Sequence, residues 1–169
     1  MMPTIEQGIG NGRDLPEDGL RGLGPVPMAG YDVHEVWYRL LPLRPWSSLA
    51  VVSPERTPKT LQVARSLVEL ATKLGRHPVE LVDGTEVDLD RANSIARLIE
   101  PARNLVPVQP GFIVALDSPI ANPVAIAVIA ASDAVLLLLE RGVTGIPQAR
   151  RIVEIVGRDR LIGAVFDVS

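Results

Sequence analysis

The sequence predicts an α/β fold, a three-layer sandwich in which helices cover both faces of a mostly parallel sheet. Short apolar runs alternate along the chain with segments of helical periodicity, and the runs are continuously apolar rather than alternating with polar residues. Continuous apolar character is typical of strands that are buried on both faces of a parallel sheet. Apolar residues make up 47% of the chain but aromatic residues only 4%, which indicates an aliphatic core.

Glycine and proline are unevenly distributed and divide the chain into two parts. Seven of the 14 glycines and four of the 15 prolines fall within residues 1–30. Such a segment buries too little apolar surface to offset its ordering entropy, so we expect a flexible tail over 1–30 and one folded domain over 31–169. The tail lacks the basic start and apolar run of a signal peptide, and Ser132 and Asp133 divide the longest apolar stretch. We therefore expect a soluble, cytoplasmic protein.

The composition excludes several classes of function. The absence of cysteine excludes disulfides, thiolate zinc sites and cysteine nucleophiles. A formal net charge of -3, from 17 basic and 20 acidic residues, argues against nonspecific nucleic-acid binding. His34 and His77 are far apart in the sequence and no other histidine exists, so we expect no metal site built on them.

The first half of the domain is predicted from helix ends and apolar runs. Apolar residues recur at helical spacing over 59–74, and Gly75 follows at the C-terminal cap position. In chain order, the other elements expected here are a helix over 33–41 that is ended by Pro42 and Pro45, a buried strand over 49–52, a strand over 79–82, a helix over 88–99 and a short strand over 105–108.

The second half has clearer patterns. A helix is expected over 144–156, with Thr144 at its N-cap, Pro147 in its first turn and its apolar residues on one face. The other expected elements are a strand over 112–116 that ends before Asp117, a helix over 124–131 and strands over 134–139 and 161–166.

The segment between the first buried strand and the next helix matches a phosphate-binding loop in register. Residues 53–60 read S-P-E-R-T-P-K-T and align with the pattern G-x-x-x-x-G-K-[ST]. Lys59 and Thr60 match the charged and metal-binding positions of the pattern. Ser53 and Pro58 stand where the two glycines belong.

Over residues 35–167 the chain resembles the bacterial tyrosine autokinases of polysaccharide export, which belong to the Min/Par-type P-loop ATPases. The motifs follow the family's order after the loop: a strand ending in Asp83, a buried strand followed by Asp117-Ser118-Pro119, an aspartate-led apolar strand over 132–139, Gly142-Val143-Thr144 and a last strand over 162–166. The resemblance implies a P-loop NTPase-like fold. In an active member, Lys59, Asp83 and Asp117 would be catalytic, Ser53, Lys59 and Thr60 would hold ATP, and Thr60 and Asp117 would hold Mg²⁺.

Pro58 is the departure that decides the chemistry. A phosphate-binding loop turns its backbone N–H groups toward the phosphates, and proline has no N–H to give. Losing one charge-assisted donor costs about 1.5–3 kcal/mol, on the order of tenfold to 150-fold in affinity. We therefore expect weak or absent ATP binding and no cofactor.

Other family features are also eroded. The strand-end motif that usually carries two aspartates keeps only Asp83, with Glu86 as a poor substitute. The asparagine that commonly follows the last strand is replaced by Asp167. The Glu/Arg oligomerisation motif retains Glu35, while its arginine positions fall on Tyr38 and Leu41, which weakens the case for rings but leaves a homo-oligomer open.

The resemblance implies a noncatalytic pseudo-ATPase or pseudokinase, a subunit or regulator in exopolysaccharide biosynthesis and export. Its partner would be an inner-membrane polysaccharide co-polymerase or chain-length protein, which would hold the chain peripherally at the inner membrane. One alternative is an active tyrosine autokinase or ATPase that uses a modified loop. Another is a Par/Min-type positioning ATPase, which is disfavoured because Pro54 replaces the early lysine of that group.

Each of these residues also has a structural interpretation. Lys59 is either a solvated residue in the first turn of a helix or a remaining anion contact. Asp83 and Asp117 are expected to hydrogen-bond a loop or cap a helix when no nucleotide is bound. The three aromatic residues Trp37, Tyr38 and Trp46 are expected to pack the first helix onto the sheet, with an exposed partner-binding patch as the alternative.

Overall fold

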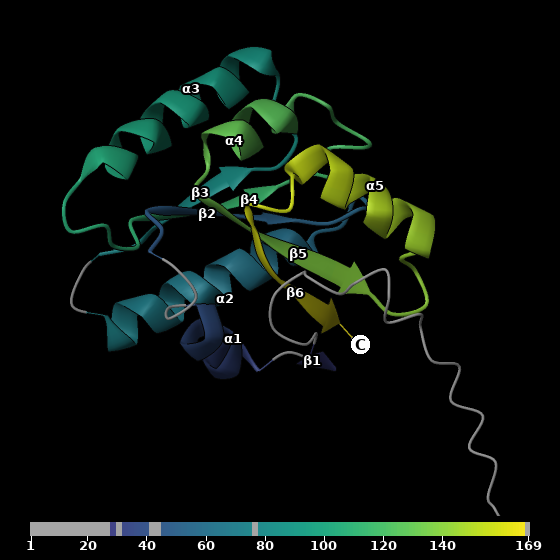
Figure 1. Cartoon of the computed structure of the whole chain (residues 1–169), viewed down its shortest axis with the longest axis horizontal. Helices are drawn as coiled ribbons and strands as arrows, with labels where there is room; N and C mark the ends of the chain where they lie inside the picture. The colour runs from purple at the N-terminus through teal and green to yellow at the C-terminus, as the bar shows by residue number, and fades with distance from the viewer. Residues whose placement is uncertain (1–27, 30–31, 41–44, 76–77, 168–169) are drawn as a thin grey trace, which may run out of the picture.

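A computed structural model describes residues 28–29, 32–40, 45–75 and 78–167. Its centre is a six-stranded sheet with the strand order β1-β6-β5-β2-β4-β3, in which every pair of neighbours is parallel (Figure 1). The strands are β1 (Met28–Ala29), β2 (Ser48–Val52), β3 (Glu80–Gly84), β4 (Phe112–Leu116), β5 (Ala134–Glu140) and β6 (Leu161–Asp167). The two-residue β1 lies within the segment predicted to be a tail; residues 1–27 and 30 of that segment lie outside the described residues.

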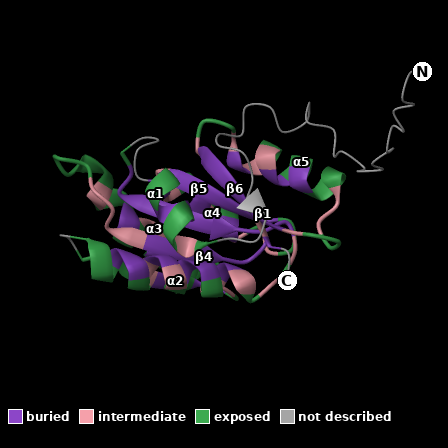
Figure 2. Cartoon of the chain, turned by 90° about the horizontal axis from the view of Figure 1, so that it is seen from below, coloured by how far each residue is buried: buried purple, intermediate pink, exposed green. Residues whose placement is uncertain are grey.

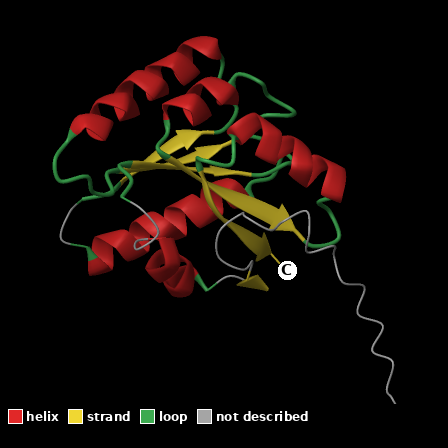
Figure 3. Ribbon diagram, viewed as in Figure 1, coloured by secondary structure: helices red, strands yellow, loops and turns green. Residues whose placement is uncertain are grey.

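Helices cover both faces of the sheet, as Figures 1 and 3 show. One face carries α1 (Val33–Leu40) and α2 (Lys59–Leu74). The other carries α3 (Leu89–Ile99), α4 (Ala125–Ala131) and α5 (Ile146–Val156), with the 3-10 helix η2 (Glu100–Asn104) following α3. The predicted three-layer α/β sandwich with a parallel sheet is therefore confirmed.

The core is aliphatic and is split by the sheet into two clusters. Successive residues of a strand point to opposite faces, so Ala50 and Val52 pack with α3, α4 and α5, while Leu49 and Val51 pack with α1 and α2. All four are fully buried, and Figure 2 shows that burial is concentrated in the strands and the inward sides of the helices. Burial on both faces explains why these runs are continuously apolar.

The strand order places β2 at the point where the chain changes direction across the sheet. β2 pairs with β4 on one side and with β5 on the other, and the chain builds β3 and β4 before it crosses to β5 and β6. In open parallel sheets, ligands bind at the carboxyl ends of strands beside such a switch point. We call the side of the sheet where the strands end the carboxyl edge, and the opposite side the amino edge.

The first helix packs on the sheet largely as predicted. Trp37 of α1 and Trp46 before β2 are buried, with their ring centroids 6.1 Å apart in an edge-to-face arrangement. Tyr38 is 62% exposed and does not take part. The described part of the chain contains no helix that is both long enough and apolar enough to cross a bilayer.

Two local predictions were wrong. No strand forms over residues 105–108: this segment is an irregular connection between η2 and β4, in which Leu105 is 58% and Val106 95% exposed. The apolar residues there have no strand to pair with and no helix to cover them. Thr144 is not the N-cap of α5; Gly145 takes that position, and the Thr144 side chain is used in a different contact.

Candidate functional site

The loop between β2 and α2 lies at the carboxyl edge, and two of its backbone N–H groups are bonded within the loop itself. The backbone N–H of Glu55 donates to Ser53 Oγ at 3.4 Å, and that of Lys59 donates to Thr57 Oγ1 at 3.3 Å. Pro58 precedes α2 with helical backbone angles, φ -72° and ψ -8°, and contributes no N–H. Of the backbone N–H groups that a phosphate-binding loop would turn toward a phosphate, those at Glu55 and Lys59 are thus bonded within the loop, and position 58 has none.

The ammonium group of Lys59 is held by two carboxylates from neighbouring strands. Lys59 Nζ lies 2.6 Å from Asp167 Oδ2 and 2.9 Å from Glu140 Oε2, at the ends of β6 and β5. The hydrogen bond to Asp167 is the largest cause, and the hydrogen bond to Glu140 the second, of a Lys59 pKa that is raised above its ordinary value of 10.5. The two carboxylates therefore take up the lysine that would otherwise meet a phosphate.

A threonine ties the loop to the segment after β5. Thr144 Oγ1 donates to Glu55 Oε2 at 2.7 Å and accepts from the backbone N–H of Glu140 at 3.0 Å. This contact explains why Thr144 is not the N-cap of α5. It brings a third carboxylate to the same side of the sheet.

A serine ties the loop to the segment after β4. Ser118 Oγ donates to the carbonyl oxygen of Pro54 at 2.5 Å, and Ser118 is 1% exposed. Together with the Thr144 contact, this bond anchors the β2–α2 loop on both sides. The described loop is therefore cross-linked by hydrogen bonds to both neighbouring loops.

The two aspartates of the resemblance accept hydrogen bonds from their own surroundings. Asp117 is 4% exposed, and its Oδ2 accepts from the backbone N–H of Glu86 at 2.7 Å. Asp83 Oδ1 accepts from the backbone and hydroxyl of Thr85, at 3.0 and 2.6 Å. Both contacts shape the turn after β3, in which Glu86 has a left-handed φ of 54°. These are the loop-bonding roles expected for the aspartates without nucleotide.

The residues at the magnesium positions do not fit a nucleotide-bound metal in this arrangement. The hydroxyl of buried Thr60 is turned to the carbonyl oxygen of Thr57 at 3.4 Å, and Asp117 is engaged with the turn after β3. Among the described residues, no group of three or more His, Cys, Asp or Glu side chains is arranged to hold a metal ion. His34 is exposed and lies 3.4 Å from Asp32, while His77 is outside the described residues.

Negative charge predominates at the carboxyl edge. Seven carboxylates and three cationic side chains lie at or beyond the ends of strands β2 to β6, a local formal charge of -4. The carboxylates are those of Glu55, Asp83, Glu86, Asp88, Asp117, Glu140 and Asp167, and the cations are Arg56, Lys59 and Arg141. The whole chain has a net charge of only -3. A triphosphate approaching this edge would be repelled.

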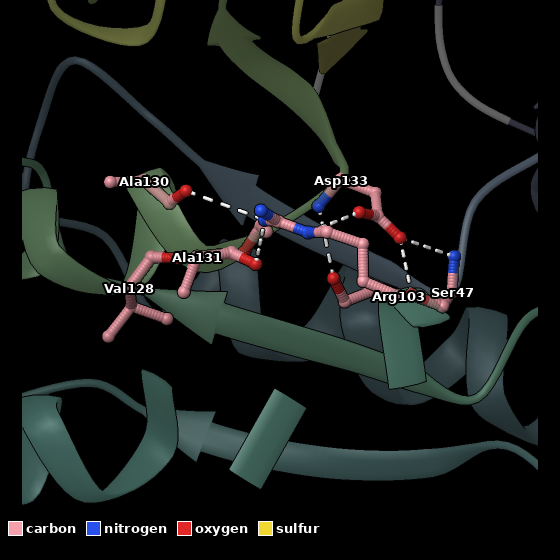
Figure 4. A network of polar contacts seen from close by, with 8 residues as sticks. Ser47, Arg103, Val128, Ala130, Ala131 and Asp133 are labelled. Carbon is pink, nitrogen blue, oxygen red and sulfur yellow. Dashed lines mark hydrogen bonds and ion pairs between the residues drawn. The ribbon is translucent and has the colours of Figure 1, made fainter. Parts of the chain in front are cut away.

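A second polar cluster lies at the amino edge (Figure 4). Asp133 accepts from the backbone N–H and the hydroxyl of Ser47, while Arg103 Nε lies 2.9 Å from its other oxygen. The backbone N–H of Asp133 donates to Ser48 Oγ at 3.0 Å. Arg103 also donates to the carbonyl oxygens of Ala130 and Ala131, at the C-terminal end of α4. This cluster joins β2, β5, η2 and α4.

Sequence reasoning found the loop but missed most of its partners. Ser53 and Pro58 lie in the loop and Lys59 and Thr60 begin α2, whereas the roles of Glu55, Glu140 and Thr144 were not anticipated. Their signal is positional, because all three lie at or after the ends of adjacent strands. The pairing of β2 with β5, and of β5 with β6, brings them together.

The comparisons with known proteins return no match: no family model, no curated protein and no solved structure matches this chain. The resemblance stated above rests on the residues quoted for it.

Proposed function

We propose that the chain is a noncatalytic pseudo-ATPase or pseudokinase, a subunit or regulator in exopolysaccharide biosynthesis and export. The observation that carries the proposal is the pairing of Lys59 with Asp167 and Glu140. Nucleotide binding would have to break both contacts, in a loop that lacks the Pro58 N–H and at an edge with a net charge of -4. Each of these features lowers the affinity of the loop for a phosphate group.

The proposed partner is an inner-membrane polysaccharide co-polymerase or chain-length protein, which would place the chain peripherally at the cytoplasmic side of that membrane. This part of the proposal is supported by the sequence resemblance over residues 35–167. Pull-down of the tagged protein from cells tests it. Recovery of a polysaccharide-synthesis membrane protein is expected, and recovery of none would count heavily against the assignment.

The noncatalytic character is tested by calorimetric titration of ATP with Mg²⁺ into the full chain. We expect no saturable heat in the micromolar range. Micromolar binding that Lys59→Ala abolishes would overturn the proposal and favour the active ATPase or tyrosine autokinase, with Lys59, Asp83 and Asp117 as its catalytic residues.

A matched set of variants separates the two causes of lost binding. Pro58→Gly restores an N–H to the loop, and Glu140→Gln with Asp167→Asn removes the charges that hold Lys59. We expect measurable ATP affinity when all three substitutions are combined, and less with either part alone. Lys73→Ala at the opposite end of α2 is the control and should change nothing.

A further inference from the structure

Three exposed aliphatic side chains follow strand ends at the carboxyl edge, two of them in loops and one at the start of α5. Ile120 follows β4 and is 42% exposed, while Val143 and Ile146 follow β5 and are 60% and 40% exposed. One such residue on a surface needs no explanation, but these three belong to the two segments, after β4 and after β5, that are bonded to the β2–α2 loop.

The hydrogen bonds described above fix how these loops are arranged. Ser118, two residues before Ile120, is bonded to Pro54, and Thr144, next to Val143, is bonded to Glu55. Since Pro54 and Glu55 are consecutive, the segments that carry the aliphatic side chains are both bonded to the β2–α2 loop. We call the loop together with these two segments the carboxyl-edge surface.

The negative charge of this surface determines which kind of partner it favours. The edge has a local net charge of -4, and Glu86 and Asp88 are exposed on it. Two copies of the chain meeting through this edge would oppose their negative charges, and a nucleotide would be repelled in the same way. A polypeptide with cationic side chains meets the opposite condition, because charge complementarity speeds its approach and favours its register.

We propose that the carboxyl-edge surface docks a partner segment in which arginine or lysine residues are interspersed with aliphatic residues. The aliphatic side chains would cover Ile120, Val143 and Ile146, and the cationic groups would pair with the carboxylates that Lys59 leaves in excess. The inference deepens the proposed function and rests on it, because a bound nucleotide would occupy the same edge.

The test uses the purified full chain with a photoreactive phenylalanine derivative at Val143. A matched control carries the same group at Leu105, which is 58% exposed but lies at the amino edge. The probes are two ten-residue peptides, one alternating arginine with leucine and one alternating glutamate with leucine. Crosslinking is measured at low salt, where charge interactions are least screened.

We expect the Val143 position to crosslink the arginine peptide at least tenfold more than the glutamate peptide, and tenfold more than the Leu105 position does. Glu86→Lys should reduce this yield at least fivefold, because Glu86 is exposed at the edge. Glu69→Lys, on an exposed position of α2 away from it, should leave the yield unchanged. Equal yields from both peptides, or from both positions, would overturn the docking proposal.

The proposed function is tested separately by adding ATP with Mg²⁺ and no peptide. Nucleotide binding in that arm would refute the noncatalytic assignment, whatever the peptides do. Absence of nucleotide binding together with peptide yields that ignore charge would refute only the docking surface.

Discussion

The amino and carboxyl edges of the sheet use ionic groups in opposite ways. At the amino edge, Asp133 is matched by donors from Ser47 and Arg103, and the contacts join four elements. At the carboxyl edge, Lys59 is shared by Glu140 and Asp167, and five further carboxylates lie at the same edge.

This difference separates charged side chains that are paired within the fold from carboxylates that are in excess over the nearby cations. A matched carboxylate is what a stable interior favours, because an unpaired partner would be costly to bury. An excess of like charge at one edge opposes compaction. We therefore place the proposed function at the carboxyl edge.

The largest expected effect is at the amino edge. Asp133→Ala leaves the Ser47 N–H and hydroxyl without their acceptor and removes the carboxylate partner of Arg103, and should lower the free energy of unfolding by about 3 kcal/mol. Urea denaturation measures this effect. Glu154→Ala removes the exposed Arg151–Glu154 pair and should cost less than about 0.5 kcal/mol. Equal costs for the two variants would contradict the structural role of Asp133.

A smaller effect is expected for Lys59→Met at the carboxyl edge. This change leaves Glu140 and Asp167 facing each other without a cation, so the melting temperature should fall, but by less than in Asp133→Ala. Thermal melts of Lys59→Met with and without Glu140→Gln and Asp167→Asn check the cause, since the neutral amides remove like charges that are too buried for salt to screen fully. A deficit that the two amides do not reduce would point to lost packing instead.

The effect of pH at Lys59 has a defined sign. Because its folded pKa is raised above 10.5, the protonated lysine contributes stability that is complete below that value and is lost as the pH rises through the higher folded pKa. Titration of the Lys59 Cε resonance by NMR in the folded protein should give a higher midpoint than in the unfolded chain. A lower or equal midpoint would show that the two carboxylates do not hold the ammonium.

Much of the fold followed from sequence because its signals are local. Helical spacing over 59–74 and the apolar run 112–116 correspond to α2 and β4. The predicted strand over 105–108 failed because an apolar run forms a strand only where a neighbouring strand completes its hydrogen bonds.

The site was predictable only in part. The position of Lys59 is encoded in one motif, but its partners Glu140 and Asp167 come from strands that are distant in sequence. Their contact depends on the order β6-β5-β2, which spacing along the chain does not reveal. The role of Thr144 was missed for the same reason, since its partner Glu55 is 89 residues away.

One measurement tests directly whether the chain's own carboxylates occupy Lys59 in place of a phosphate. The chain contains only two lysines, Lys59 and Lys73, so selective labelling gives one reporter in the loop and one control at the far end of α2. Millimolar ATP with Mg²⁺ should leave the Lys59 Cε resonance where it is, as it leaves that of Lys73. A saturable shift of Lys59 alone would contradict this expectation and show that the loop still binds nucleotide.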